Sequence, residues 1–454
     1  MTSALSEAEP LVFWLDDKAA PSPLPPLAGA ETADLAVVGG GYTGLWTALR
    51  AKERYPDLDI VLLEAYTCGS AASGRNGGFC DASLTHGFAN GLARWPEELP
   101  VLERVGRENL EAIGETIARL GIDCDWRRTG ELTVATAPHH LEELASEAAV
   151  RGGVTLLDQD AVRAEVNSPT YLGGLWDASG TALVEPARLA WGLREACLEL
   201  GVRIYENTRV RQLRSGLLST AMGSVRADRI AVATNAFPSL LRRLRLYTVP
   251  VYDLVLVTEP LSPAQLATIG WQRRQGVGDA SNLFHYYRLT RDDRILWGGY
   301  IPLYYYGSRI NPALEQRDDI HLLLAQHFFE TFPQLEGLRF THRWGGVIDT
   351  STRFCAFFGT ALGGRVSYAL GYTGLGVAAT RFGADVMLDL LYAETTERTH
   401  LRMVRERPLP FPPEPLRAAA IHLTRHSMSR ADTNAGHRNL WLRTLDRLGL
   451  GLDF

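Results

Sequence analysis

Residues 34–64 carry the pattern whose residue types and spacing are best suited to bind a dinucleotide. An apolar run, 35–38, leads into Gly39, Gly41 and Gly44, which stand in G-x-G-x-x-G spacing. In this pattern the first glycine permits a tight turn, and the second lets a pyrophosphate approach the backbone. The third glycine allows the following helix to pack closely on the strand. The spacing therefore predicts a dinucleotide site, although the glycines alone would also fit an ordinary turn.

A helix and a second strand complete this unit. The helix begins at Tyr42 and Thr43, and its N-terminus would offer unpaired N–H groups and a positive dipole end to phosphates. The apolar run 60–63 predicts the second strand, which Glu64 follows. Glu64 lies twenty residues after Gly44, where an acidic side chain can bind the ribose hydroxyls.

The segment after the second strand indicates which dinucleotide is bound. Residues 69–78 read GSAASGRNGG, and such small, glycine-rich segments are typical of flavoproteins, in which the chain runs close beside the isoalloxazine ring. With its SGRNGG sequence at 73–78, the chain resembles the D-amino-acid oxidase-like family of FAD-dependent oxidoreductases, in the branch of the glycine, sarcosine and γ-glutamylputrescine oxidases. Further segments that match in family order are 184–210, 228–237, 284–300, 343–346 and 371–391.

The resemblance implies an α/β fold. A discontinuous Rossmann-like FAD-binding domain would carry an inserted α+β substrate domain built on an antiparallel sheet. The chain of 454 residues is long enough for two or three domains. The expected parts are an N-terminal arm (1–30), the FAD-binding domain (31–96, 180–244 and 346–412), the substrate domain (97–179 and 245–345) and a C-terminal helical tail (413–454).

Periodicity and turn residues predict the elements within this frame. We expect helices over 97–120, 138–151, 186–200 and 377–392, and strands over 129–136, 203–210, 228–234 and 365–372. In the tail, apolar residues recur at helical spacing at Leu440, Leu442, Leu445 and Leu448. This spacing predicts a helix that docks on the body of the protein or lies on a membrane surface.

A second glycine-rich turn lies at 371–377, between a predicted strand and a predicted helix. A reduced flavin carries negative charge at N1–C2=O, and a helix N-terminus aimed there would stabilise it. The resemblance places this turn at that end of the flavin, while an ordinary strand-to-helix loop is the alternative. Leu375 departs from the family, in which Asn or His is common at this position.

The resemblance also bears on how FAD is held. Some relatives attach FAD covalently through a histidine eleven residues after the ribose acid, and this position is Arg75 here, which cannot form that bond. Others use a cysteine near the position of Trp344 and Gly345, whereas Cys355 lies ten residues after Gly345. Non-covalent FAD is therefore predicted. Arg75 would pair with a phosphate, lie over the flavin edge, or form an ordinary salt bridge in its loop.

The resemblance also places Val210 and Asn235 near the adenine and ribose. The other predicted FAD-binding residues are Gly39, Gly41, Tyr42, Thr43, Gly44, Glu64, Ser73, Gly74, Arg75, Asn76, Gly77, Gly78, Trp344, Gly345, Gly371, Thr373, Gly374, Leu375, Gly376 and Val377.

The reaction that the resemblance implies is hydride transfer from a C–H next to nitrogen to flavin N5, which gives an imine. It needs close packing over the ring and exclusion of water rather than a strong base. The candidate catalytic residues are Tyr252, His285, Tyr287, Tyr300 and Arg353. Aromatic walls can hold an amine cation, and an arginine can pair with a substrate carboxylate or phosphonate. Ordinary packing within the sheet is the alternative for the tyrosines.

Oxygen is the expected electron acceptor, although the chain has only two lysines, Lys18 and Lys52, and neither is placed to promote reaction with oxygen. A dehydrogenase or a flavin-dependent monooxygenase in a biosynthetic pathway is the alternative. A third possibility, oxidation of a modified tRNA base, is disfavoured by the net charge of −6, and no nucleic-acid partner is expected.

Cysteine usage and hydropathy bear on the compartment and on metals. The five cysteines are scattered, with no C-x-x-C pair, and neither Cys nor His shows metal-ligand spacing, so no metal is expected. An odd, low cysteine count favours a reducing, cytoplasmic location. No apolar run approaches 18 residues and no signal peptide is recognised, so no membrane span is expected.

Overall fold

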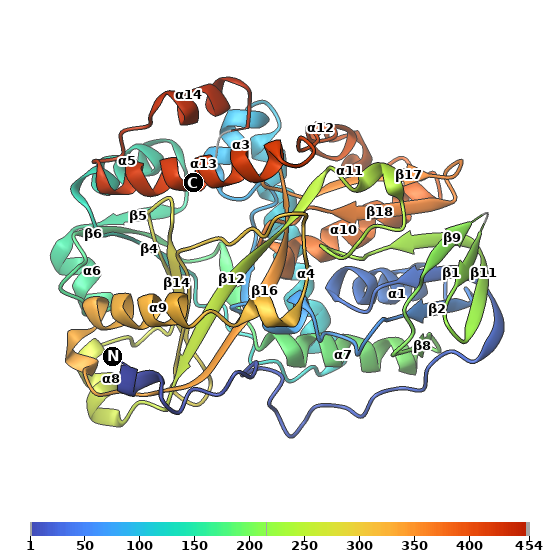
Figure 1. The fold of residues 1–454 in the computed structure, drawn as a ribbon, viewed down its shortest axis with the longest axis horizontal. Coiled ribbons are helices and arrows are strands. Elements are labelled where there is room, and N and C mark those ends of the chain that lie inside the picture. Colours follow the sequence, from blue (N-terminus) through green and yellow to red (C-terminus); the bar gives the residue numbers. More distant parts are fainter. Residues whose placement is uncertain (1, 215, 451–454) are drawn as a thin grey trace.

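The computed structural model describes residues 2–214 and 216–450. Within these residues two eight-stranded sheets lie side by side, the first on the right of Figure 1 and the second on the left, with a two-stranded sheet as the third. This arrangement is the α/β fold that the sequence predicts.

The first sheet is the nucleotide-binding type and is mostly parallel. Its main path runs β17-β18-β11-β1-β2-β8, and only the edge strand β17 pairs antiparallel along it. The strands of this path are β1 (Gly29–Val38), β2 (Ile60–Leu63), β8 (Arg203–Tyr205), β11 (Gly223–Val232), β17 (Phe357–Ala361) and β18 (Val366–Leu370). The short strands β9 (Gln212–Arg214) and β10 (Leu217–Ser219) extend it beside β11.

Helices cover this sheet, so strands such as β2 and β18 are buried along their whole length. The helix α1 (Tyr42–Arg54) contacts both α10 (Gly376–Leu391) and α7 (Pro186–Glu199). The interior between them is apolar, with Leu45, Leu49 and other side chains fully buried. These helices place the N-termini of α1 and α10 near one another.

The second sheet is antiparallel except for the β13–β4 pair, in the order β16-β12-β15-β14-β13-β4-β6-β5. Its strands are β4 (Glu131–Ala135), β5 (Val154–Leu157), β6 (Gly173–Asp177), β12 (Thr248–Thr258), β13 (Gly276–Asp279), β14 (His285–Leu289), β15 (Ile295–Gly299) and β16 (Phe340–Ser351). The helix α9 (Asp318–Thr331) packs on one face of this sheet over an aromatic core that includes Tyr287, Trp297, Phe328 and Phe332.

Strand β16 joins the two halves of the molecule. It is twelve residues long and pairs with β12 from Phe340 to Ser351, with one register irregularity near Val257. The Gly345–Gly346 step, which the sequence predicts as a domain boundary, lies in the middle of this strand. The remaining domain limits stay predictions.

The remaining elements connect and cover the sheets. They are η1 (Thr2–Leu5), α2 (Ala72–Arg75), β3 (Phe79–Asp81), α3 (Phe88–Arg94), α4 (Leu99–Leu120), α5 (Pro138–Val150), α6 (Gln159–Glu165), β7 (Thr181–Leu183), η2 (Arg242–Leu244), α8 (Pro263–Ile269), η3 (Pro312–Glu315), η4 (Pro333–Leu335), α11 (Glu397–His400), α12 (Arg402–Arg405), α13 (Leu416–Thr433) and α14 (Leu440–Arg447).

The strand predicted over 203–210 is wrong in its second half, because the chain leaves the sheet after Tyr205. The buried carboxylate of Glu206 accepts the N–H groups of Leu24 and Cys68, both at 2.7 Å. These bonds turn the chain away from the sheet edge and toward the N-terminal arm. Val210 therefore lies outside any strand.

The tail forms two helices, and both dock on the body. Met428 and Ala431 of α13 and Leu442 of α14 are buried against Leu283, and in Figure 1 both helices lie over the upper part of the second sheet. Among the described helices, none has the length and apolar character needed to cross a membrane.

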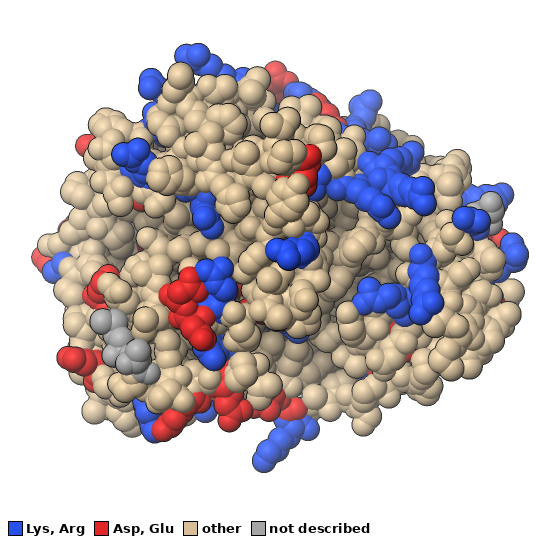
Figure 2. All heavy atoms as spheres, viewed as in Figure 1, with Lys and Arg blue, Asp and Glu red and all other residues tan. Residues whose placement is uncertain are grey.

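Charge is unevenly distributed over the face that Figure 2 shows. Lysine and arginine side chains gather on its right side, over the region of α11, α12 and β17. Acidic side chains gather along the lower left edge. The region of α13 and α14 carries only separate charged groups, so the tail presents a mainly uncharged surface on this face.

Candidate active site

A cavity of about 730 Å³ lies where the two sheets meet. Its walls come from the start of α1, the 72–77 segment, strands β12 and β16, the turn before α10, and the C-terminal tail. The cavity therefore brings together the glycine-rich turns predicted to bind FAD and the aromatic sheet predicted to face the substrate. Of the predicted FAD-binding residues, those that line it are Gly41, Tyr42, Thr43, Ser73, Arg75, Asn76, Gly77, Asn235, Thr373, Gly374, Leu375, Gly376 and Val377.

The first glycine turn is as tight as its spacing predicts. Gly39 has a φ of +113°, and a Cβ on it would lie 2.3 Å from the carbonyl oxygen of Ala233. A Cβ on Gly44 would lie 1.8 Å from the carbonyl oxygen of Gly39. Gly41 is the N-cap of α1, and the Tyr42 N–H donates to Ser73 Oγ at 2.9 Å. Only glycine fits this turn, which leaves the helix N-terminus open toward the cavity.

Glu64 lies at the carboxyl end of β2, outside the cavity wall. Its Oε2 accepts the N–H of Gly40 at 2.6 Å, and its Oε1 accepts the N–H of Tyr66 at 2.8 Å. Burial raises the pKa of this carboxyl, and the two N–H groups oppose that effect. Glu64 thus supports the turn itself, and contact with a ribose stays a prediction.

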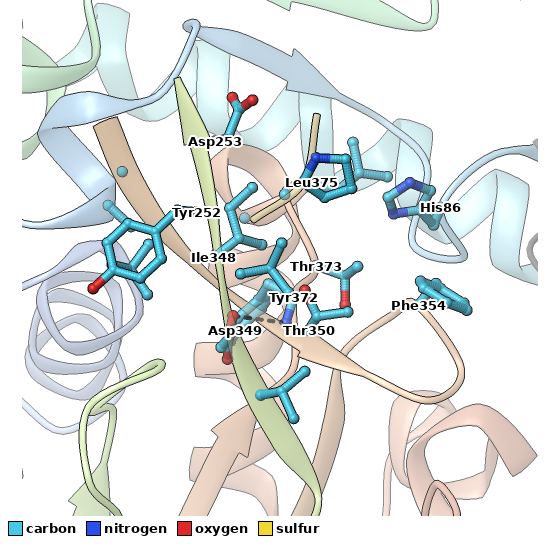
Figure 3. Close-up of a pocket in the computed structure, with 18 of the residues that line it drawn as sticks. His86, Tyr252, Asp253, Ile348, Asp349, Thr350, Phe354, Tyr372, Thr373 and Leu375 are labelled. Carbon is cyan, nitrogen blue, oxygen red and sulfur yellow. Dashed lines mark hydrogen bonds between the residues drawn. The ribbon is translucent and has the colours of Figure 1, made fainter. Parts of the chain in front are cut away.

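The second glycine turn is held by a buried acid, Asp349. This β16 side chain accepts the N–H groups of Gly371 at 2.5 Å and Tyr372 at 3.2 Å, and burial raises its pKa to about 7. In Figure 3, Thr373 and Leu375 lie between the β16 residues and the side chains of His86 and Phe354. The carboxylate fixes the turn that opens α10 toward the cavity.

Gly374 leaves room for a ligand at this turn. Its φ is +93°, and a Cβ added there would meet nothing within 4 Å. Gly376 begins α10, so the N-terminus of that helix opens into the cavity beside it. The two open helix N-termini, of α1 and α10, fit the pyrophosphate and the electron-rich end of a flavin dinucleotide, respectively.

Arg75 forms a salt bridge, which was one of the three roles expected for it from the sequence. Its Nη1 lies 2.6 Å from Glu315 Oε2, and its Nε donates to the Ser70 carbonyl at 2.8 Å. The Trp344 indole donates to the Arg75 carbonyl at 2.9 Å. Trp344 is buried, and a Cβ on Gly345 would meet Glu315, so both residues support this loop rather than line the cavity.

Five other predicted FAD-binding residues also lie behind the cavity wall. They are Gly39, Gly44, Gly74, Gly78 and Gly371. For the two in the SGRNGG segment, close packing is the reason. A Cβ on Gly74 would lie 2.3 Å from the Gly69 carbonyl oxygen, and one on Gly78 would lie 2.2 Å from the Val184 carbonyl oxygen.

Tyr252 and Tyr300 are the predicted catalytic residues that reach the cavity. Tyr252 Oη donates to the Arg309 carbonyl at 3.2 Å. Tyr300 has a φ of +73° and stacks on His285, with ring centroids 5.2 Å apart. Asp253 follows Tyr252 in β12 and also lines the cavity; it accepts the Tyr286 hydroxyl at 2.5 Å, and burial raises its pKa to about 6. This part of the wall therefore combines aromatic side chains with a buried carboxyl.

His285 and Tyr287 do not line the cavity, contrary to the prediction. His285 is buried, with its Nε2 2.9 Å from His327 Nδ1, and its pKa is lowered to about 3 by burial. Tyr287 points away from the cavity, and its hydroxyl lies 2.5 Å from that of Tyr171 in the core under α9. His285 and Tyr287 are two residues apart and share one face of β14, where both rings contact Trp297. Tyr286 between them faces the other side and lines the cavity.

Arg353 is likewise a structural residue rather than a substrate partner. Its buried guanidinium donates to the carbonyl oxygens of Ala356, Met403 and Glu406, the last two at 2.9 and 3.0 Å. Burial lowers its pKa. Its Nη1 and Nη2 groups hold the chain within and just after α12, and Arg353 does not line the cavity, so the prediction that it is a pocket residue is wrong.

Strained backbone gathers around the cavity. His86, Asn235, Tyr300, Phe354 and Thr373 all line it with φ between +49° and +73°. Such conformations cost side chains other than glycine of order 1–3 kcal/mol each and concentrate at functional sites. The pKa of His86 is lowered to about 4 by burial, so this ring is neutral near pH 7.

Sequence reasoning missed several cavity residues. Asp349 could have been found as an acid within the apolar strand pattern RWGGVID, and Asp253 within VYDLVLV. No such signal marked the tail residues that line the cavity, among them Arg425 and Trp441. Helical periodicity predicts a helix but not the surface on which it packs. Neither Lys18 nor Lys52 lines the cavity.

The comparisons with known proteins agree with this geometry. Residues 34–390 match the model of the family described as "DAO: FAD dependent oxidoreductase". Over 390 residues the chain is 35% identical to γ-glutamylputrescine oxidoreductase of Escherichia coli strain K12, covering 82% of this chain and 86% of the relative.

Solved structures share the fold at lower identity. Glycine oxidase from Geobacillus kaustophilus superposes with a TM-score of 0.69 at 20% identity, over 84% of this chain and all of that one. L-proline dehydrogenase from P. horikoshii does so with a TM-score of 0.68 at 16% identity, over 82% and 96% of the two chains. The chain belongs to the DAO family of FAD-dependent oxidoreductases, and its cofactor is FAD.

Proposed function

We propose that this enzyme oxidises an amine or amino acid at the C–H next to nitrogen, with oxygen as the final electron acceptor. The observation that carries the proposal is the single cavity that joins both glycine turns to the aromatic wall of the second sheet. Substrate gives up a hydride and a proton to become an imine, and oxygen becomes hydrogen peroxide. FAD, when bound, supplies the group that accepts the hydride.

The chain's own residues bind and orient in this proposal. The open N-terminus of α1 at Gly41 would hold the pyrophosphate, and that of α10 at Gly376 would face the electron-rich end of the flavin. Tyr252 and Tyr300 would pack against the substrate and exclude water. Asp253, with its raised pKa, would lie behind them as a buried acceptor.

The curated relative supports an amine as the substrate class. The chain is 35% identical to a protein named for γ-glutamylputrescine, a substituted amine, and covers most of its length. The structural neighbours include enzymes named for glycine, proline and iminodiacetate. All of these compounds carry a C–H next to nitrogen, the bond that the proposal places over the flavin.

Non-covalent attachment of FAD is part of the proposal. All five cysteines are buried, and the cavity wall in the described chain contains none of them. Arg75 occupies the position of the covalent histidine of some relatives and is engaged with Glu315. Neither lysine lines the cavity, so positive charge for the reaction with oxygen would come from an arginine of the cavity wall.

The test is anaerobic titration of the purified holoenzyme with a panel of amines and amino acids. Bleaching of flavin absorbance by an amine, followed by recovery and peroxide formation in air, would establish the proposal. Bleaching without recovery in air would indicate a dehydrogenase. Bleaching by NADPH alone would overturn the proposal in favour of a monooxygenase.

A further inference from the structure

The C-terminal tail supplies part of the cavity wall, although it lies beyond the segment that matches the family. The family match ends at residue 390, whereas α13 and α14 lie between 416 and 447. Both helices line the cavity, with Ile421, Arg425, Met428, Trp441, Leu445 and Leu448 among the contributing residues. The substrate side of the cavity is therefore completed by a segment that the family pattern does not specify.

The tail is fixed in place by specific bonds. Asp432 of α13 accepts the N–H groups of Asn282 at 2.9 Å and Leu283 at 3.1 Å, next to the wall residue Phe284. At the start of the tail, Glu414 accepts the Gly307 N–H at 3.0 Å. Because both ends of α13 are anchored, the side chains on its inner face have defined positions.

Among the tail residues that the structure describes, up to residue 450, Arg425 is the one charged residue in this wall. Its side chain is half-buried and forms no ion pair or hydrogen bond with the part of the chain that the structure describes. The other arginine of the wall, Arg75, is neutralised by Glu315. Burial and the neighbouring Arg317 both lower the pKa of Arg425, and Arg317 is itself paired with Asp319 at 2.6 Å.

An arginine in this position favours an anion. A partly desolvated cation beside a second cation is costly unless a negative group joins it. The guanidinium fork matches a carboxylate with two parallel hydrogen bonds. The apolar residues around Arg425, such as Ile421 and Met428, suit an aliphatic chain rather than a second charge.

We propose that the cavity takes an amine whose aliphatic chain ends in a carboxylate, with Arg425 binding that carboxylate and the inner face of the tail contacting the chain. The inference rests on the proposed amine oxidation and refines its substrate class. The carboxylate is distant from the oxidised carbon, and the tail carries this specificity.

The test compares ligands that differ only in the terminal group. In anaerobic titrations of the wild-type holoenzyme, 6-aminohexanoate should half-reduce the flavin at a concentration about 10- to 100-fold below that of hexylamine. Arg425→Ala should abolish this preference, and Arg425→Lys should retain part of it. Arg430→Ala, an exposed site on the same helix, should keep it in full. An unchanged preference in Arg425→Ala would overturn the inference.

A binding measurement separates this inference from the proposed function. Hexanoate and 1-hexanol cannot be oxidised as amines, and each perturbs the flavin spectrum only by occupying the cavity. Hexanoate should bind the wild type about tenfold or more tightly than 1-hexanol, and Arg425→Ala should remove the difference. If no amine reduces the flavin but this difference is observed, the amine proposal fails and the Arg425 site stands. Equal binding of the two ligands to the wild type would contradict the Arg425 site whether or not amines are oxidised.

Discussion

The carboxylate of Asp349 accepts the N–H of Tyr372 at 3.2 Å and so ties strand β16 to the turn that opens α10. The same carboxylate accepts the N–H of Gly371. Two backbone donors that would otherwise be buried without partners are satisfied by one side chain, and the N-terminus of α10 is thereby aimed into the cavity.

Replacing Asp349 by alanine should loosen this turn. The change removes both acceptors from a buried site, which should lower the free energy of unfolding by about 1–3 kcal/mol. The turn also opens α10 toward the cofactor, so FAD should be lost more readily on dialysis. Urea unfolding and residual flavin absorbance measure the two effects. The exposed Asp57→Ala variant is the control, and equal behaviour of the two variants would contradict the role of Asp349.

Gly374→Ala should separate the cost of strain from the loss of cofactor space. Gly374 and Gly364 have φ of +93° and +85°, and a Cβ meets nothing within 4 Å at either. Each alanine should therefore cost about 1–2 kcal/mol of stability. Gly374 lines the cavity and Gly364 does not, so only Gly374→Ala should bind FAD about tenfold or more weakly. Equal FAD affinity in the two variants, measured by reconstitution of apoprotein, would argue against a cofactor at this turn.

Asp253 should make stability depend on pH. Burial raises its pKa from 3.8 to about 6, so the folded state retains a proton that the unfolded state has released. Its contribution is fully present below about pH 4 and is lost as the pH rises through about 6. Asp253→Asn can still accept the Tyr286 hydroxyl but cannot ionise. The variant should gain roughly 1–3 kcal/mol relative to the wild type between pH 4 and pH 7.

This expectation is checked by urea unfolding of the apoprotein at both pH values. Asp57→Asn, at an exposed site, provides the reference for nonspecific charge effects. A difference between Asp253→Asn and wild type that stays constant from pH 4 to pH 7 would show that the carboxyl does not titrate in this range.

The flavin should be released completely by acid. Arg75 stands where a histidine would be needed for one known type of linkage, and the five cysteines are buried away from the cavity wall. Precipitation with trichloroacetic acid should leave a white pellet and a yellow supernatant. A yellow pellet after repeated washing would mean that a residue of this chain is bonded to FAD.

Local sequence signals predicted the nucleotide-binding half of the fold well. The strand expected at 60–63 is β2, and the helix expected over 377–392 is α10 within one residue at each end. Both signals are local: β2 is an apolar run between polar residues, and α10 directly follows the turn glycines at 371–376. The roles of Gly39 and Gly44 in the tight turn follow from the same short-range pattern.

The errors concern residues whose surroundings come from distant parts of the chain. Arg353 was expected to face the substrate, but its partners at Met403 and Glu406 lie fifty and more residues away. Tyr287 was expected in the cavity because aromatic side chains suit a substrate wall. The alternation of side chains along β14 instead directs it into the core on the other face of the sheet. The position of α13 beside the cavity depends on hydrogen bonds with residues 282–283, about 150 residues earlier in the chain, which periodicity within the tail cannot predict.

The unbroken course of β16 also limits how such an enzyme can change. Trp344 supports the Arg75 loop from one part of this strand, and Asp349 holds the cofactor turn from another. A single inserted or deleted residue between them would rotate every later side chain to the opposite face and detach the turn from its acid. Length variation is therefore expected to be excluded from this part of β16. New substrate preferences in this lineage should arise mainly through replacements and indels after residue 412, while the spacing between Trp344 and Asp349 stays constant.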